Sequence, residues 1–267
     1  MKIKIGFFGV GNMGYAIIRS AVESGYIEAN RIGVYDILAQ NAQRAAGLGV
    51  VVYDCARKLA ADCEYIFLCA KPQDFAELIA GIKQAADKET VVVSVGAGID
   101  YDFLSDSFGF APKTVLCMPN APLMIGAGAA ALAKAGGISH EQYKFVEGVF
   151  SSGGTAVLID KDKMNEIIAI NASSPAFIYL FAKGFAEYAQ DAGLDARDSM
   201  KLFCAALRGS AAMLESSDKT IDELITMVAS KGGTTEAGLR VFNEKGLTET
   251  VKSACNACLD RARGMRD

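Results

Sequence analysis

The stretch Lys2-Ile3-Lys4-Ile5-Gly6-Phe7-Phe8-Gly9-Val10-Gly11-Asn12-Met13-Gly14 decides the fold of this chain. Its first half is a short apolar segment typical of a strand, and residues 15–22 behind it predict a helix. The pattern G-x-G-x-x-G therefore lies between a strand and a helix, where it can bind the pyrophosphate of a dinucleotide. Gly9 permits the tight turn, Gly11 lets the pyrophosphate approach the backbone, and Gly14 lets the helix pack on the strand.

A carboxylate ends the next predicted strand, residues 31–36, at Asp36. In dinucleotide-binding units an acid about 20 residues beyond the glycines bonds the adenosine ribose hydroxyls. A glycine turn that only tightened the packing would leave Asp36 unexplained. The predicted dinucleotide-binding residues are therefore Gly9, Gly11, Asn12, Met13, Gly14 and Asp36.

The composition excludes several classes of function. The chain has 267 residues, 51% of them hydrophobic, and a net charge of −4 from 27 Lys+Arg against 31 Asp+Glu. No uninterrupted apolar run reaches the length of a membrane span, and the start of the sequence has no signal-peptide pattern. No basic patch or long charge run stands out, so nucleic acid is not expected as a partner, and neither is a membrane.

The thiols and the single histidine narrow the chemistry. Seven cysteines, an odd number scattered through apolar segments, are typical of reduced thiols in a cytoplasmic protein. Cys255 and Cys258 form a C-x-x-C pair in a predicted helix, and no second pair completes a zinc site, so no metal site is predicted. His140, the only histidine, lies in a polar helix start, which argues against acid–base chemistry by histidine.

Strand and helix patterns alternate in the first part of the chain and give way to helices in the second. Further strands are predicted at 50–53, 65–70, 90–95, 114–118 and 155–159, and the glycines at 126–128 and 136–137 are interpreted as turns. Helices are predicted at 163–192, 196–215, 220–229, 235–245 and 248–263. The predicted fold is α/β: an N-terminal Rossmann domain with a doubly wound parallel sheet, residues 1–160, and an all-helical domain, residues 161–267. The helices carry more apolar faces than one small bundle can bury, which predicts a homodimer or a higher homo-oligomer.

Three predicted strands end in residues suited to a cofactor. They are followed by Ala70-Lys71-Pro72-Gln73, by Gly96-Ala97-Gly98 and by Met118-Pro119-Asn120-Ala121-Pro122. Lys71 could reach a phosphate or the nicotinamide ribose, and the Asn120 amide suits a carboxamide. Each segment also has an ordinary role as a turn, but strand ends in such sheets face one ligand crevice.

A glycine pair flanked by hydroxyls lies far along the chain, in Ala229-Ser230-Lys231-Gly232-Gly233-Thr234-Thr235-Glu236-Ala237-Gly238. Glycines let backbone N–H groups crowd around a ligand, and a helix start suits a small carboxylate. The simpler interpretation is a helix that begins, capped by its hydroxyls, after a glycine loop.

These motifs together resemble the pyrroline-5-carboxylate reductase family along essentially the whole chain. The matching stretches are 8–14, 70–73, 95–99, 118–122, 173–177 and 230–235. The resemblance implies a reductase that converts the cyclic imine 1-pyrroline-5-carboxylate to L-proline with NADPH or NADH.

The resemblance also implies roles for individual residues. The family's cofactor contacts fall on the glycine loop and on Ala70, Lys71, Pro72, Gly96 and Asn120. By this resemblance, Ser230, Gly232, Gly233 and Thr234 bind the substrate carboxylate. Thr235 forms a hydrogen bond with the ring nitrogen and is the one catalytic residue. Family dimers form through the helical domains, so this loop can serve a site whose cofactor belongs to the neighbouring subunit.

Four positions depart from the family pattern, which usually has Pro at Lys231 and often has Arg at Leu116, Thr at Ala121 and Gly at Ala172. These departures leave a non-catalytic, NAD(P)H-sensing regulatory paralogue open as an alternative.

A second alternative is a β-hydroxyacid dehydrogenase-like reductase. Such enzymes use a catalytic Lys on the interdomain helix, where this chain has Asn171 and the step Ser173-Ser174-Pro175.

Overall fold

A computed structural model describes residues 3–264. These residues form two compact units, one of residues 3–175 with 257–264 and the other of residues 176–256. Within residues 3–264, no helix combines the length and the apolar character that a membrane crossing needs.

The first unit is built on one eight-stranded sheet with the order β3-β2-β1-β4-β5-β6-β7-β8. The strands are β1 Ile5–Phe8, β2 Ile32–Tyr35, β3 Val51–Val52, β4 Tyr65–Leu68, β5 Val91–Ser94, β6 Lys113–Pro119, β7 Gly128–Ala135 and β8 Gly154–Leu158. Strands β1 to β6 are parallel, and the strand order reverses between β1 and β4. The predicted Rossmann sheet is therefore confirmed.

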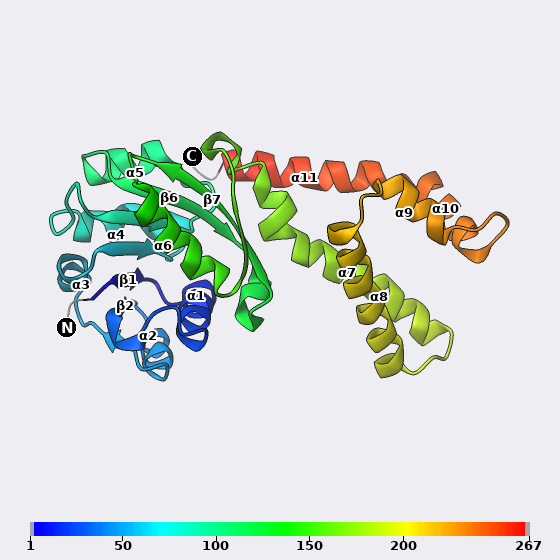
Figure 1. Ribbon diagram of the computed structural model, residues 1–267, viewed down its shortest axis with the longest axis horizontal. Coiled ribbons are helices and arrows are strands. Elements are labelled where there is room, and N and C mark those ends of the chain that lie inside the picture. The colour runs from blue at the N-terminus through cyan, green and yellow to red at the C-terminus, as the bar shows by residue number, and fades with distance from the viewer. Residues whose placement is uncertain (1–2, 265–267) are drawn as a thin grey trace. The chain divides into compact units, whose positions relative to one another are not determined.

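Helices cover both faces of this sheet (Figure 1). They are α1 Asn12–Glu23, α2 Ala39–Ala46, α3 Ala56–Asp62, α4 Phe75–Ile82, α5 Tyr101–Phe108 and α6 His140–Ser151. Successive strand residues point to opposite faces, so Phe7 joins an apolar core with α1 and α6, whereas Phe8 joins one with α3, α4 and α5. Both side chains are fully buried.

Strand β7 corrects the sequence prediction. It pairs antiparallel with β6, and β8 pairs parallel with β7, so the last two strands run against the other six. The sequence predicts only turns at the glycines that flank this alanine-rich segment, because alanine has a low strand propensity. Gly128 is part of the strand: a Cβ there would lie 2.6 Å from the backbone of Leu123.

The connection between the sheet and the long helices is irregular. A 3-10 turn, Lys161–Lys163, precedes a π-helix, Ala169–Ser173, which leads into α7, Ser174–Asp191. The sequence predicts a helix from 163 to 192 that is interrupted only at Pro175, and it does not predict the π-helix that precedes this residue. Pro175 lacks an N–H and its ring collides with the carbonyl four residues earlier, so the chain cannot keep α-helical geometry at that step.

The second unit is helical, as predicted. It holds most of α7 and the first part of α11, Leu247–Arg263, with α8 Ala196–Ser216, α9 Ile221–Val228 and α10 Thr234–Glu244 between them. Four phenylalanines, Phe181, Phe185, Phe203 and Phe242, contact one another with ring centroids 4.6–6.4 Å apart. No residue of α8, α9 or α10 is buried.

Candidate functional site

The carboxyl ends of β1, β2, β4, β5 and β6 bring the predicted cofactor residues to one edge of the first unit. The glycine loop follows β1, Asp36 follows β2, and Ala70 to Pro72, Gly96 and Asn120 follow β4, β5 and β6. Ligands bind at this edge of doubly wound sheets, next to the point where the strand order reverses.

The glycine loop has the shape that a pyrophosphate needs. Gly9 has φ +93°, and a Cβ there would lie 2.6 Å from the Ala70 nitrogen. A Cβ on Gly14 would lie 2.5 Å from the Gly9 oxygen, whereas one on Gly11 would meet no atom within 4 Å. Helix α1 begins at Asn12 without a side-chain cap, so its first N–H groups have no partner inside the helix and are available to an anion. This cradle fits a dinucleotide.

The Asp36 carboxylate is hydrogen-bonded to the glycine loop. Its Oδ2 accepts hydrogen bonds from the Val10 N–H at 2.6 Å and from Asn41 Nδ2 at 3.2 Å, and its Oδ1 accepts one from the Leu38 N–H at 2.8 Å. A carboxylate has about four acceptor positions, so Oδ1 retains room for one ribose hydroxyl. The sequence analysis did not anticipate Asn41, because nothing in the sequence marks a partner for Asp36.

Arg44 crosses the loop from α2. Its guanidinium lies 4.3 Å from the centre of the Tyr15 ring and donates to the Val10 carbonyl at 3.1 Å and to Asn12 Oδ1 at 3.4 Å. The loop thus has a carboxylate on its N–H side and a cation on its carbonyl side.

Asn120 takes part in an amide pair beyond β6. Its Oδ1 accepts from the Ala129 N–H at 2.8 Å, and its Nδ2 donates to Asn171 Oδ1 at 3.1 Å. Asn171, on the π-helix, is 9% exposed and donates to the carbonyls of Met118 at 2.5 Å and Ala129 at 3.2 Å. The Asn120 oxygen is therefore engaged within the protein, and one N–H remains for a cofactor amide.

The other two strand ends differ in character. Lys71 is exposed just before a 3-10 turn, Pro72–Asp74. A Cβ on Gly96 would lie 2.8 Å from Ile99 and 2.9 Å from Phe75, so close packing requires this glycine. Cys69 lies beside Gly14, and burial raises the pKa of its thiol, which disfavours the thiolate form.

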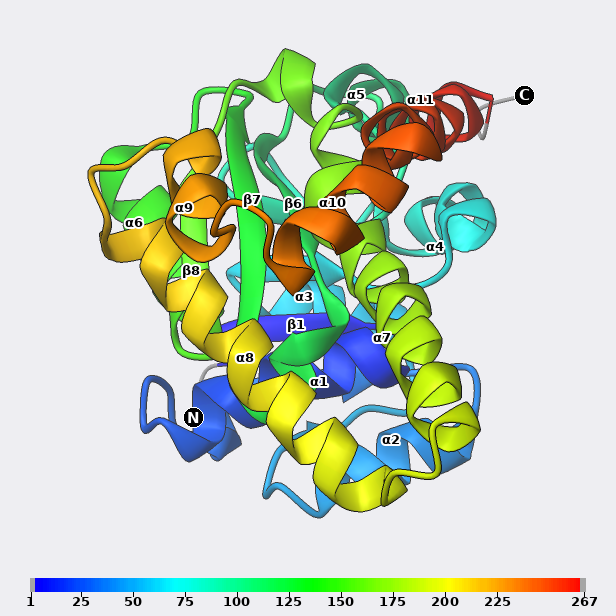
Figure 2. The same cartoon turned by 90° about the vertical axis from the view of Figure 1, so that its right-hand side faces the viewer.

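The hydroxyl-rich loop of the second unit joins α9 to α10 (Figure 2). The Gly233 N–H donates to the Ser230 carbonyl at 2.9 Å, and Gly232 has φ +75°. Among the described residues only glycines have positive φ, so Lys231 does not, and the loop is a type II turn. The Gly232 N–H donates to Glu236 Oε2 at 2.6 Å. Glu236 is not among the predicted site residues, although its place three residues after the N-cap Gly233 is the capping-box position.

Thr234 and Thr235 begin α10, whose first-turn N–H groups have no partner inside the helix. The structure places all of the predicted substrate residues, Ser230 and Gly232 to Thr235, within this turn and the first turn of the helix.

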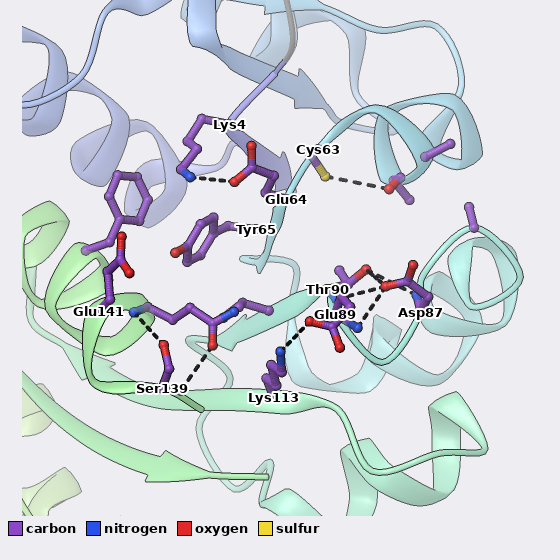
Figure 3. A pocket seen from close by; sticks show the side chains of 16 residues that line it. Lys4, Cys63, Glu64, Tyr65, Asp87, Glu89, Thr90, Lys113, Ser139 and Glu141 are labelled. Atoms are coloured by element: carbon purple, nitrogen blue, oxygen red, sulfur yellow. Dashed lines mark hydrogen bonds and ion pairs between the residues drawn. The ribbon is translucent and has the colours of Figure 1, made fainter. Parts of the chain in front are cut away.

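A hollow of about 650 Å³ opens at the opposite edge of the sheet, where β1, β4, β5 and β6 begin (Figure 3). Four of its charged groups form ion pairs, Lys4 with Glu64 at 2.5 Å and Lys113 with Glu89 at 2.7 Å. Burial, followed by the charge of Glu64, raises the pKa of Tyr65 on its wall to about 12. None of the predicted site residues lines it.

Two family models match the chain. The one described as pyrroline-5-carboxylate reductase dimerisation matches residues 161–265, and the one described as NADP oxidoreductase, coenzyme F420-dependent, matches residues 4–98. The pyrroline-5-carboxylate reductase of Escherichia coli strain K12 is 30% identical over 266 residues, 98% of each chain. The chain belongs to the pyrroline-5-carboxylate reductase family. The predicted resemblance is thereby confirmed. The pyrroline-5-carboxylate reductase of Staphylococcus aureus strain COL is 28% identical to the present chain over 97% of each chain.

Solved structures agree with this membership. The Plasmodium falciparum pyrroline carboxylate reductase, with NADP bound, has a TM-score of 0.91 and 25% identity, covering 99% of this chain and 98% of its own. The Streptococcus pyogenes 1-pyrroline-5-carboxylate reductase has a TM-score of 0.89 and 27% identity, covering 98% of each chain. A 3-hydroxyisobutyrate dehydrogenase from Mycobacterium tuberculosis shares only the fold, at 17% identity and a TM-score of 0.51.

The departures from the family pattern lie in different surroundings. Leu116 is 3% exposed and belongs to the core under α3, α4 and α5, so this chain has no cation at that place on β6. Ala121 begins a 3-10 turn, Ala172 lies in the π-helix, and Lys231 is exposed on the type II turn.

Proposed function

We propose that this protein reduces 1-pyrroline-5-carboxylate to L-proline with NADH or NADPH. The observation that carries the proposal is the match of the whole chain, 98% of it at 30% identity, to a pyrroline-5-carboxylate reductase. The geometry supports it, because one unit has a dinucleotide cradle and the other has a hydroxyl-rich helix start suited to a carboxylate.

When bound, the reduced nicotinamide supplies a hydride to the imine carbon of the substrate, and the ring nitrogen takes up a proton. The chain's own residues have to bind the two molecules and orient them, since a protonated imine is already a strong electrophile. We assign the pyrophosphate to the first N–H groups of α1 and the loop from Gly9 to Gly14. We assign the nicotinamide part of the cofactor to contacts with Ala70, Lys71, Pro72, Gly96 and Asn120.

The substrate carboxylate is assigned to Ser230, Gly232, Gly233 and Thr234. Thr235 is assigned to the ring nitrogen, where its hydroxyl orients the imine; the high pKa of an aliphatic hydroxyl makes Thr a poor general acid. No histidine or cysteine is needed for this reaction.

The assembly belongs to the same proposal. Residues 1–160 form the cofactor domain, and residues 161–267 form the substrate and dimerisation domain of a homodimer or higher homo-oligomer. The exposed apolar surface of α8, α9 and α10 supports this assignment. The cytoplasm is the proposed location, supported by the free thiols of all seven cysteines.

The test is steady-state oxidation of NADH and of NADPH, followed by absorbance, with 1-pyrroline-5-carboxylate as substrate. Oxidation that depends on the imine acid supports the proposal. Oxidation or reduction of coenzyme with β-hydroxy acids alone would point to the dehydrogenase-like alternative. Tight coenzyme binding without turnover would point to a regulatory paralogue.

A further inference from the structure

In the substrate loop of the second unit, residues 230–235, both glycine N–H groups already donate hydrogen bonds within the protein. The Gly233 N–H donates to Ser230 and the Gly232 N–H donates to the Glu236 carboxylate, at 2.9 Å and 2.6 Å. A substrate carboxylate that relied on these two groups would have to break both contacts. The donors that the helix leaves without internal partners lie one step further along the chain, at Thr234 and Thr235.

The contact from Glu236 fixes the shape of the loop. Gly232 occupies the third position of the type II turn with φ +75°, a conformation that an isolated glycine adopts only part of the time. Glu236 lies in the first turn of α10, where the helix dipole favours a carboxylate, and hydrogen bonds from N–H groups to carboxylates belong to the strong class. The helix thus anchors the turn through a side chain, in the manner of a capping box displaced by one residue.

We propose that Glu236 is a positioning residue for the substrate loop. Its carboxylate holds the Gly232 N–H, and the substrate carboxylate is received by the N–H groups of Thr234 and Thr235 with the hydroxyls of Thr234 and Ser230, which leaves the Thr235 hydroxyl to the ring nitrogen. The inference rests on the proposed function, because it refines how that site binds an imino acid. It adds Glu236 to the site and moves the anion contact away from the glycine pair.

A competing account makes Glu236 a stand-in that the substrate expels from Gly232. That account leaves the expelled carboxylate beside the incoming one, where two like charges at an exposed site repel each other. The positioning account needs no such displacement, since the helix start offers enough free donors.

Two variants and a matched control separate these accounts. Glu236→Ala removes the acceptor, and Glu236→Gln keeps an oxygen that can accept from Gly232. Glu244→Ala is the control, because Glu244 is also an exposed acid of α10 whose partner, Arg240 at 3.9 Å, lies outside the loop. Steady-state kinetics of each full-length protein give kcat and the Michaelis constants for the imine acid and for the coenzyme.

We expect Glu236→Ala to raise the KM for the imine acid by about tenfold, the factor that corresponds to losing one charge-assisted hydrogen bond. The KM for the coenzyme stays unchanged, and Glu236→Gln restores most of the affinity. Glu244→Ala behaves like the unaltered protein. A fall in the KM for the imine acid in Glu236→Ala would overturn the proposal in favour of the stand-in, and an unchanged KM would overturn it altogether.

A second readout is independent of turnover. The exchange rate of the Gly232 amide hydrogen, measured by NMR or mass spectrometry, should rise in Glu236→Ala and stay slow in the unaltered protein when L-proline is added. Loss of protection on adding L-proline would again overturn the proposal. If the unaltered protein shows no turnover, the proposed function fails, while the exchange of Gly232 still reports whether Glu236 holds the loop.

Discussion

At the scale of single residues, Asp36 combines an observed contact with a proposed one. Its carboxylate supports the glycine loop through the Val10 N–H, and its Oδ1 has room for one ribose hydroxyl. A carboxylate at this place also repels a 2′-phosphate, although the nearby Arg44 opposes that repulsion.

We therefore predict that the protein uses NADH at least as efficiently as NADPH. The comparison is kcat/KM for the two coenzymes, first in the unaltered protein and then in Asp36→Ser. The variant should lose efficiency with both coenzymes, because the loop loses its acceptor, and more of it with NADH. Asp106→Ser, at an exposed acid of α5, serves as the control. A strong preference of the unaltered protein for NADPH would contradict the prediction.

Thr235 and Ser230 should differ in the kinetic constant that they control. Thr235 is assigned to the ring nitrogen, whose charge changes as hydride arrives, so Thr235→Ala should lower kcat far more than it weakens coenzyme binding. Ser230 is assigned to the carboxylate, which the reaction leaves unchanged, so Ser230→Ala should mainly raise the KM for the imine acid.

Losing a hydrogen bond to a charged group costs about 1.5–3 kcal/mol, or roughly tenfold to over a hundredfold in the affected constant. Steady-state kinetics of both variants give the measurement. A kcat of Thr235→Ala within about twofold of the unaltered value, well below this range, would show that the assignment of Thr235 is wrong.

Functional residues can be predicted from the sequence when the backbone conformation requires one residue type. They cannot be predicted when their role depends on a partner that only the folded chain brings close. Gly9 and Gly14 could be predicted because close contacts with Ala70 and with the loop itself exclude any side chain. Asn41 and Glu236 could not, since their roles depend on where the Asp36 carboxylate and the Gly232 N–H point.

At the scale of elements, the π-helix and the β6–β7 pair are joined by one buried amide. Asn171 donates to a carbonyl of each strand and accepts from Asn120. Asn171→Ala should remove the side-chain donor of the Met118 carbonyl and the acceptor of the Asn120 amide, at about 1–3 kcal/mol, whereas the Ala129 carbonyl keeps its bond from the Asn120 N–H. Thermal unfolding followed by circular dichroism should show Tm lowered by several degrees, while Asn256→Ala, at an exposed site on α11, leaves it unchanged. An unaltered Tm in Asn171→Ala would mean that water replaces the amide without loss.

Elements with a clear hydrophobic pattern could be predicted from the sequence, whereas elements without one could not. Strand β4 is a continuous apolar run, which is typical of a strand buried on both faces. Strand β7 has alanines in place of β-branched residues, and the π-helix depends on a local conflict at Pro175 within a helical pattern.

At the scale of the whole molecule, the helices after residue 175 expose large apolar side chains. Leu180 is 69% exposed, Leu202 73% and Val228 64%. A stable monomer would leave this surface in water, so we predict a dimer or larger assembly held by the helical unit. Sedimentation velocity at low micromolar concentration should show no stable monomer, and Leu202→Glu should weaken the association. A monomer that remains fully active would contradict the prediction.

The reversed direction of β7 also bears on how the sheet assembles in time. Antiparallel neighbours can close through a short connection, whereas each parallel pair of this sheet waits for a crossover helix, and Ile5 meets Tyr65 only after β2 and β3 have been made. Loop closure becomes less favourable as the intervening chain lengthens, and a hairpin forms in about 1–10 μs. The hairpin of β6 and β7 is thus the part of the sheet that can form without long-range closure. The strands β1 to β5 are synthesised first, but β5 can pair with β6 only after that later part of the chain has been made.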